Sequence, residues 1–410
     1  MIGSGIFMLP AALAAFGGIS IVGWMCASLG AVLLAVVFGY LGKLVPEANG
    51  GPFAYTRVGM GDFAAYLVAW GYWVSIWCAN AAITVAVVGY LAVFFPILET
   101  SAMAAIATGL AIVWFFTWIN SKEIKTVALV QIIATTLKIA PIILIGIWGM
   151  FYVQAENFTP FNLTAESDFS VITTTTMLTF FAFLGMESAT IPSGSVQDSE
   201  RTVRKATVFG TLATVVIYII SSVAIMGVIP AEVLAESSAP FADVAEIFWG
   251  DAAKYIVTAG AVIATMGALN GWILMQGAIP MAAAHAGLFP KIFGKVNTAH
   301  SPIYGIVISS SIVSIFMLFN YSNSLVDTFS YMMQLTTLAV TIPFLFSIIS
   351  LVRLLKRSSA GFYKKCAVAM SAFAFTVWIM VGCGSEVLIS GLVLFLLGIP
   401  FYFLISREKA

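Results

Sequence analysis

The stretch Met1-Ile2-Gly3-Ser4-Gly5-Ile6-Phe7-Met8-Leu9-Pro10 places a glycine–serine–glycine break at the start of an apolar run. A membrane helix that is interrupted by glycine frees backbone N–H and C=O groups from their helical partners. Freed backbone groups are tolerated at membrane depth only where they line a cavity or are buried in protein. The break therefore predicts a membrane fold with a small-molecule site at this point.

The composition of the chain supports a membrane protein. Its 410 residues are 61% hydrophobic and only 9% charged, whereas roughly 25% of the residues in a typical soluble domain are charged. The net charge is zero, so the chain lacks the basic surface that indicates a nucleic-acid partner. The four cysteines and two histidines show no metal-binding spacing, and we expect no metal site and no cofactor. We predict one all-α polytopic domain over residues 1–410, surrounded by the lipid bilayer.

Apolar runs of about 20 residues predict membrane-spanning helices. The first run is only half length, and two others are longer than a perpendicular crossing needs, which tilt would explain. We place twelve runs, at residues 5–16, 19–42, 62–95, 101–120, 126–152, 171–192, 203–229, 253–285, 302–320, 327–352, 366–383 and 387–406.

Charge sorting between the loops predicts the orientation. Of the 18 Lys and Arg residues, all but Lys138 and Lys254 follow an even-numbered run. The loops on the opposite side carry mainly Asp and Glu. Because loops rich in Lys and Arg stay on the cytoplasmic side, we predict that the basic face and the C-terminus are cytoplasmic. The expected location is the cytoplasmic (inner) membrane.

Two ionisable residues, Lys138 and Glu187, lie well inside apolar runs. A charge at the centre of a spanning helix costs about 2.5–3.5 kcal/mol on insertion scales, so such residues face a cavity or a partner. They either satisfy each other and nearby carbonyls, or they handle substrate or protons, and the functional interpretation is favoured. Asn80 is also polar at this depth, where an asparagine serves as interhelical glue as readily as in a binding site.

A second glycine break follows in Leu184-Gly185-Met186, next to Glu187. Five predicted helices separate it from the break at Gly3 and Gly5. Glycine-interrupted segments at matching places in two halves indicate an inverted repeat with a site at the midplane. The half-helix that begins near Gly5 would present N–H groups and positive dipole to a carboxylate. Free carbonyls near Gly185 would accept an ammonium group, and the two breaks together would hold an α-amino acid.

At these residues the chain resembles the amino acid–polyamine–organocation (APC) superfamily, and within it the basic amino acid/polyamine antiporter family, most like its arginine/agmatine antiporters. The resemblance extends from Met1 to the C-terminus. It is carried by the opening stretch and by Gly50-Gly51-Pro52-Phe53-Ala54-Tyr55, Gly185-Met186-Glu187-Ser188-Ala189, Asn270-Gly271-Trp272 and Gly287-Leu288-Phe289-Pro290.

The resemblance implies a 5+5 inverted-repeat fold of the leucine-transporter type with two extra C-terminal helices. The repeats would cover residues 1–152 and 171–352, and the extra helices residues 366–406. The first helix holds only about 12–16 residues where about 20 are needed to span a bilayer. Relatives carry a cytoplasmic tail and the inner half of this helix, so we expect an N-terminally truncated form or a start at a misassigned internal Met. A homodimer is also implied.

The resemblance further implies the residues of the site. Ser4 and its neighbours would bind the substrate carboxylate, and Trp272 would stack on the distal cation, although a single tryptophan is otherwise more often a packing residue. Tyr72 would form the outer gate, Glu187 would take part in gating and pH sensing, and Phe344 replaces a gate tyrosine. The implied substrate-binding residues are Met1, Gly3, Ser4, Gly5, Ser75, Ile76, Asn80, Ile83, Phe181, Leu184, Gly185, Trp272 and Thr336.

The expected activity is alternating-access exchange of a cationic amino acid, such as arginine, ornithine or lysine, for a related amine or amino acid. Some positions depart from the arginine/agmatine pattern. Phe181 replaces a tryptophan, and Lys138 resembles the helix 5 lysine of sodium-independent permeases. A proton-coupled permease for neutral amino acids that uses Lys138 is therefore the alternative. An intramembrane enzyme or a channel is remote, because no nucleophile–base set is evident.

Overall fold

The computed structural model describes residue 3 and residues 5–45, 51–122, 141–187, 199–320, 324–358 and 361–407. Within these ranges the regular structure is helical, without a β-strand. Eight helices are long and apolar enough to cross a membrane. They are α2 (Ser20–Leu44), α4 (Asp62–Ala92), α6 (Ala102–Asn120), α9 (Ser199–Val228), α12 (Asp251–His285), α14 (Leu325–Leu354), α15 (Phe362–Val381), and α16 (Gly384–Leu396) continued by α17 (Gly398–Arg407).

Four shorter apolar helices accompany them among the described residues. They are α1 (Gly5–Ala14), residues Pro141–Tyr152, α8 (Asp168–Phe180) and α13 (Ile303–Asn320). The predicted spans thus find a helix wherever the structure describes the run, and the prediction of an all-helical multi-pass membrane protein is confirmed. The run at 126–152 is described only from residue 141, and the relation between the two halves stays a prediction.

Several short helices were not predicted. They are α3 (Pro52–Met60), α5 (Ile97–Thr100), α10 (Ala231–Ala235) and α11 (Pro240–Trp249), with the 3-10 turns η2 (Ala155–Phe158) and η6 (Lys291–Gly294). Two further 3-10 turns, η1 (Met150–Tyr152) and η3 (Phe181–Phe183), lie within predicted runs. The run at 387–406 is also divided, because α16 ends at Leu396 and α17 begins at Gly398. Hydropathy detects a helix by its length in the membrane, and these segments are too short to carry that signal.

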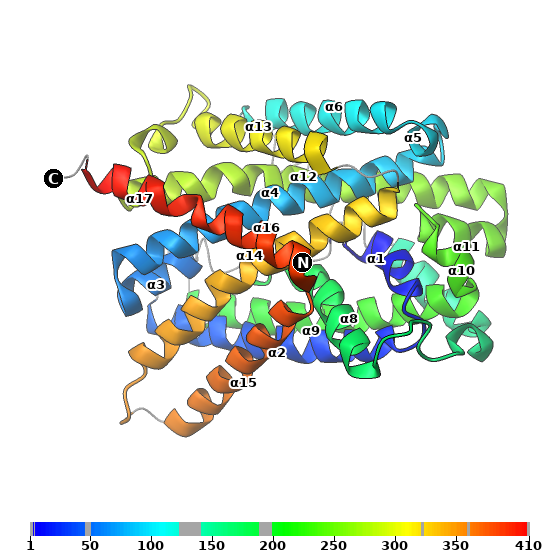
Figure 1. Cartoon of the computed structure of the whole chain (residues 1–410), viewed down its shortest axis with the longest axis horizontal. Coiled ribbons are helices and arrows are strands. Elements are labelled where there is room, and N and C mark those ends of the chain that lie inside the picture. Colours follow the sequence, from blue (N-terminus) through cyan, green and yellow to red (C-terminus); the bar gives the residue numbers. More distant parts are fainter. Residues whose placement is uncertain are drawn as a thin grey trace.

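The bundle is elongated, and the short helices mark its two ends. Figure 1 shows α3 at the left end of the long axis and α10 and α11 at the right end. The Arg57 guanidinium of α3 donates to the Ala286 carbonyl at the end of α12, over 3.0 Å. We call this the basic end, since it also holds Lys122 and Lys291. The opposite, acidic end carries Glu99 and the Asp and Glu residues of α10 and α11.

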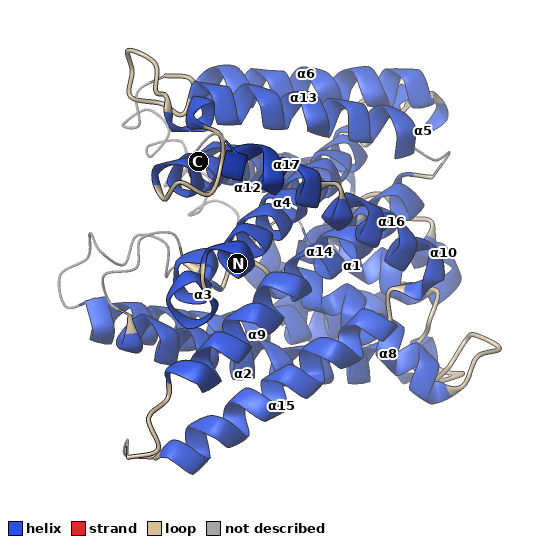
Figure 2. Ribbon diagram, turned by 60° about the vertical axis from the view of Figure 1, so that its left-hand side comes forward, coloured by secondary structure: helices blue, strands red, loops and turns tan. Residues whose placement is uncertain are grey.

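Helix α4 is the centre of the bundle, and it is buried along almost its whole length. It packs against α12, α13 and α14 and receives α3 and α5 at its two ends. Figures 1 and 2 agree that α6 and α13 lie side by side on one flank and α15 on the opposite flank. A site that is lined by α4 therefore lies near the centre of the bundle.

The structure describes both predicted breaks in part. Helix α1 begins at Gly5. At the second break α8 ends at Phe180 and the turn η3 ends at Phe183, after which Leu184 is extended, with φ −61° and ψ 144°. Gly185 follows with φ +93°, in the left-handed region that glycine adopts without a steric penalty. The helix thus ends before Gly185, as predicted, and residues 188–198 lie outside the described residues.

Candidate functional site

A small cavity of about 30 Å³ lies where α1, α4, α12 and the second break meet. Four elements supply its lining, and six of the eight residues were predicted from the sequence. The lining residues are Gly3, Gly5, Ala79, Ile83, Phe181, Ala182, Leu184 and Trp272. Ala79 and Ala182 were missed because a lone alanine in an apolar run carries no chemical signal.

Glycine at position 5 brings the two breaks together. A Cβ atom at Gly5 would lie 3.2 Å from Cδ1 of Phe181 and 3.3 Å from the Cα of Ala182. These contacts are tighter than ordinary packing, so a larger residue would push α1 away from η3. The first N–H groups of an α-helix have no intrahelical partner and form a positive dipole end. The N-terminus of α1 therefore gives one wall of the cavity an affinity for anionic groups.

Other predicted site residues lie outside the cavity lining. The hydroxyls of Ser75 and Thr336 donate to carbonyls of their own helices, those of Tyr72 and Met332, each over 2.7 Å. Ile76 is fully buried in α4. Phe344, on α14, packs edge-on against Phe38 with ring centroids 5.2 Å apart. The assignment of these positions to substrate binding or gating stays a prediction.

A buried hydrogen-bonded pair lies on the basic side of the cavity. The Tyr72 hydroxyl donates to the Glu187 carboxylate over 2.7 Å, and the N–H of Gly185 donates to the same carboxylate over 3.1 Å. At 1.5 Å per residue, Tyr72 lies about 10 Å along α4 from Ala79, toward the basic end. The carboxylate thereby joins the second break directly to α4.

A second junction lies on the acidic side. The Tyr90 hydroxyl of α4 donates to the Phe7 carbonyl of α1 over 2.9 Å and accepts from the N–H of Phe241 in α11 over 3.4 Å. The Phe7 ring also packs against Tyr90 and Phe241, at centroid distances of 5.6 and 5.2 Å. One hydroxyl thus connects α1, α4 and the start of α11, about 10 Å beyond Ile83 along α4.

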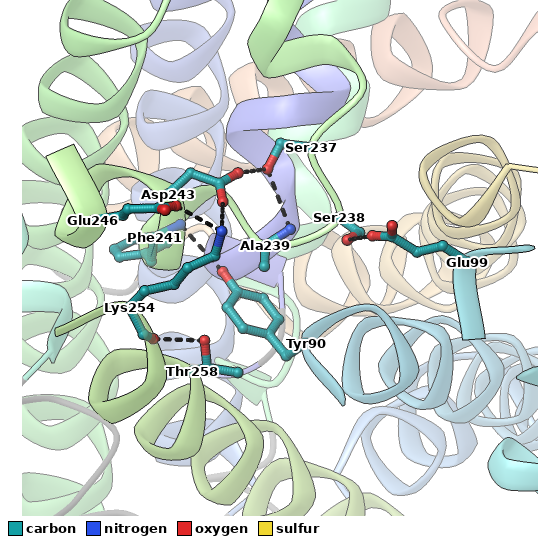
Figure 3. Close-up of polar contacts among 10 residues, drawn as sticks. All are labelled: Tyr90, Glu99, Ser237, Ser238, Ala239, Phe241, Asp243, Glu246, Lys254 and Thr258. Carbon is teal, nitrogen blue, oxygen red and sulfur yellow. Dashed lines mark hydrogen bonds and ion pairs between the residues drawn. The ribbon is translucent and has the colours of Figure 1, made fainter. Parts of the chain in front are cut away.

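Helices α10 and α11 form a lid over this junction, and Figure 3 shows its polar contacts. The Lys254 ammonium lies 2.6 Å from the Glu246 carboxylate and 3.7 Å from that of Asp243. Ser237 donates to Asp243, and Ser238 donates to Glu99 of α5. Burial raises the pKa of the Asp243 carboxyl, against the opposing effects of the Ser237 hydroxyl and the Lys254 charge. The lid is therefore tied both to α12 and to α5.

Comparison with known proteins identifies the family of this chain. The family model described as amino acid permease matches residues 1–405. The chain belongs to the amino acid permease family. Its members are transporters, so the expectation that the chain is not an enzyme is confirmed.

Three relatives of this permease cover nearly all of it. A putative arginine/ornithine antiporter of Bacillus subtilis (strain 168) is 31% identical over 100% of this chain and 94% of the relative. The cadaverine/lysine antiporter of Escherichia coli (strain K12) is 31% identical over 98% of this chain and 91% of the relative. The arginine/agmatine antiporter of Chlamydia pneumoniae is 29% identical over 100% and 88%. The predicted resemblance to cationic amino acid antiporters is confirmed.

A larger cavity of about 210 Å³ lies elsewhere in the permease, between α4, α13, α17 and the turn η6. Apolar and aromatic side chains form its wall, among them Trp70, Phe289 and Phe401. A zwitterion would lose its hydration there without gaining hydrogen-bonding partners, which is costly. The smaller cavity, at the two breaks, is therefore the candidate substrate site.

Three predicted residues, Met1, Ser4 and Lys138, lie outside the described residues of the permease. One polar side chain next to the cavity was missed, namely Gln276, whose amide accepts a hydrogen bond from Asn80 over 2.6 Å. The signal for it was available, because an amide in the middle of a spanning run is as unusual at position 276 as at position 80. The glue interpretation of Asn80 is thus borne out, and its contact with substrate stays a prediction.

Proposed function

We propose that this permease is an antiporter that exchanges a cationic amino acid for a related amine or amino acid by alternating access. The observation that carries the proposal is the convergence of both helix breaks and Trp272 on one cavity. The names of the three relatives support the substrate class, since each combines a cationic amino acid with an amine or a second amino acid. We place the protein in the cytoplasmic membrane with the basic end in the cytoplasm, and a homodimer stays a prediction.

The cavity offers different chemistry to the two ends of such a substrate. The N-terminus of α1 would hold the α-carboxylate through N–H groups and the helix dipole. Backbone carbonyls between Phe181 and Gly185 would accept from the α-ammonium. The indole of Trp272 would stack on the distal cation, a contact that gains about 2 kcal/mol when it is desolvated. A neutral amino acid would forgo this last contact.

The two junctions would act as the barriers of the transport cycle. With the basic end in the cytoplasm, the Tyr72–Glu187 pair lies on the inner side of the cavity and the Tyr90–Phe7 contact on the outer side. We therefore assign Tyr72 to the inner barrier rather than to the outer gate that the resemblance implied. Phe181, whose ring packs against Phe329 at a centroid distance of 6.1 Å, lies between the two barriers.

Exchange by purified protein in liposomes tests the proposal. Vesicles loaded with arginine should take up labelled arginine, ornithine or lysine from outside, and empty vesicles should not. Trp272→Leu should weaken uptake of cationic substrates by about thirtyfold, the factor that corresponds to about 2 kcal/mol for a desolvated cation–π contact. Trp249→Leu, a change at the acidic end on an exposed tryptophan, is the matched control.

The neutral-permease alternative makes the opposite prediction in the same vesicles. The aliphatic lining residues Ala79, Ile83 and Leu184 would suit an apolar side chain. If leucine or alanine competes with the labelled substrate and arginine does not, the cationic assignment is wrong. Lys138→Ala should then impair transport far more than Lys409→Ala.

Glu187 provides a separate test of the inner barrier. Protonation would turn this hydrogen-bond acceptor into a partial donor and weaken its contacts with Tyr72 and Gly185. We expect Glu187→Gln to flatten the pH dependence of transport while substrate binding stays largely intact. Transport rates between pH 5 and 8 measure this, and a pH profile unchanged from wild type would leave Glu187 with a structural role only.

A further inference from the structure

One amide side chain, that of Gln276 on α12, ties three helices together beside the cavity. Its Nε2 donates to the Ser310 hydroxyl over 2.7 Å and to the Ile306 carbonyl over 3.2 Å, both on α13. Its Oε1 accepts from Nδ2 of Asn80 on α4 over 2.6 Å. Gln276 and Asn80 are both fully buried, so water cannot replace these bonds.

These contacts leave only one orientation for each amide. The Ile306 carbonyl can only accept a hydrogen bond, so the NH₂ group of Gln276 must face α13 and its oxygen must face α4. The oxygen of Gln276 in turn can only accept, so the NH₂ group of Asn80 must face Gln276. An asparagine amide is otherwise free to take either of two orientations. Gln276 therefore removes a choice that Asn80 alone would keep.

The consequence is an unpaired oxygen at Asn80. Its Oδ1 points away from Gln276, is buried, and has no hydrogen-bond donor among the described residues. A buried polar atom without a partner is costly. Others occur among the described residues, including Oδ1 of Asn120, but Asn80 differs from Asn120 in directly following a residue of the cavity lining. An acceptor that pairs with a hydrogen-bond donor on a bound ligand would explain the unpaired Oδ1 of Asn80.

The position of the pair fits the candidate substrate site. Asn80 directly follows Ala79 and precedes Ile83 by three residues on α4, and Gln276 follows Trp272 by four residues on α12. Residues three or four apart lie on the same face of a helix. Helix α4 runs toward the acidic end and α12 runs toward the basic end. The step from Ile83 back to Asn80 and the step from Trp272 on to Gln276 therefore both lead toward the basic end. The Asn80–Gln276 pair thus lies about one helical turn from Ile83 and Trp272, on the side of the basic end.

We propose that Gln276 is a positioning residue, which holds the Asn80 amide so that its carbonyl oxygen accepts a hydrogen bond from the cationic group of the substrate. This inference rests on the proposed function. A carbonyl oxygen attracts ammonium and guanidinium groups, whereas the reversed amide would present N–H groups and repel them. Gln276 would therefore contribute to the preference for cationic over neutral amino acids without touching the substrate.

The test measures binding of arginine, lysine and leucine to purified full-length protein by competition against a labelled substrate. Gln276→Leu keeps the volume but frees the Asn80 amide to rotate. We expect affinity for arginine and lysine to fall at least about tenfold, the effect of a misplaced hydrogen bond to a charged group, with affinity for leucine unchanged. Should this variant not fold, Gln276→Met is measured in its place.

A matched control separates positioning from stability. Asn120 of α6 donates from Nδ2 to Oδ1 of Asn270 on α12 over 2.9 Å, an amide pair of the same kind outside the cavity lining. Asn120→Leu should lower thermal stability as Gln276→Leu does, and it should leave the arginine-to-leucine affinity ratio unchanged. An equal change of this ratio in both variants would overturn the positioning role.

A second substitution provides a rescue. Both oxygens of an aspartate accept hydrogen bonds, so Asn80→Asp has no wrong orientation. In the Asn80→Asp background we expect Gln276→Leu to cost no further selectivity for cations. If the double variant loses as much selectivity as Gln276→Leu alone, the inference fails. Wild-type protein that binds no cationic amino acid would instead refute the proposed function.

Discussion

Two groups of helices lie around the candidate cavity, and they are held together by different forces. Helices α4, α6, α12 and α13 are joined by buried side-chain hydrogen bonds. The amide pairs Asn80–Gln276 and Asn120–Asn270 and the hydroxyl pair Thr117–Ser310 span 2.6 to 2.9 Å. Such bonds are directional, so a small rotation of one helix breaks several at once.

Helices α2, α8 and α9 meet instead through small residues and aromatic rings. The indole of Trp24 packs against Phe183 and Tyr218, with centroids 5.9 and 5.6 Å apart. The backbone of α2 approaches α8 closely at Gly23, where the Thr179 hydroxyl donates to the Gly23 carbonyl over 3.2 Å. Apart from this hydrogen bond, the contacts just named depend on distance far more than on angle, and packed helices can slide along such contacts.

The difference assigns separate tasks to the two groups. We expect the hydrogen-bonded group, which presents Ile83 and Trp272, to keep its shape, and the second group and α1 to move relative to it during transport. The polar contacts between the groups, Tyr72–Glu187 and Tyr90–Phe7, then connect a moving part to a fixed one. Three substitutions test this division.

The largest expected effect is a loss of stability when Gly23 is replaced. A Cβ atom there would lie 2.4 Å from the Thr175 hydroxyl oxygen and 2.8 Å from its carbonyl carbon. Gly23→Ala should force α2 and α8 apart and cost about 1–3 kcal/mol of stability. Gly42→Ala on the same helix meets one atom at 3.6 Å and should be neutral or stabilising. Thermal unfolding in detergent compares them, and equal melting temperatures would contradict close packing at Gly23.

A smaller effect is expected at Tyr90. Tyr90→Phe removes the hydroxyl that joins α1, α4 and α11, which costs about 1 kcal/mol for the hydrogen bonds lost. We expect the acidic end to open more often, so that a cysteine introduced at Ile83 reacts several times faster with a thiol reagent applied from that side. Tyr331→Phe, which loses a bond to Ser390 of 3.2 Å between α14 and α16, is the control. Unchanged labelling would show that Tyr90 is no barrier.

The smallest expected effect is a pH dependence in the stability of the lid helices α10 and α11. Burial raises the folded-state pKa of Asp243, which also faces Glu246, Glu99 and Lys254. The folded lid therefore binds a proton more tightly than the unfolded chain does. Its stabilisation is fully present below the ordinary pKa of about 3.9 and is lost as pH rises through the folded pKa. Hydrogen exchange of residues 237–250 should be slower at acid pH in wild type, after correction for intrinsic rates, and Asp243→Asn should remove this trend.

The sequence predicted those features that a single segment specifies. Length and hydropathy located the spanning helices, and the glycine at position 185 located the second break. The cavity residues Ile83, Phe181, Leu184 and Trp272 followed from the resemblance to known antiporters. Features that need two distant segments escaped prediction. The Asn80–Gln276 bond joins residues 196 positions apart, and the lid helices α10 and α11 are too short to stand out from a loop by hydropathy.

The small volume of the cavity affects how substrate affinity should be interpreted. An apolar cavity of roughly 150 Å³ holds one benzene molecule, and the cavity here is about 30 Å³. An amino acid would therefore fit this cavity only in an expanded form of the protein. The observed dissociation constant equals the intrinsic one divided by the fraction of expanded molecules. A variant that adopts the expanded form more often would bind substrate more tightly and still transport it more slowly. Affinity alone is therefore a poor guide to which variants transport well.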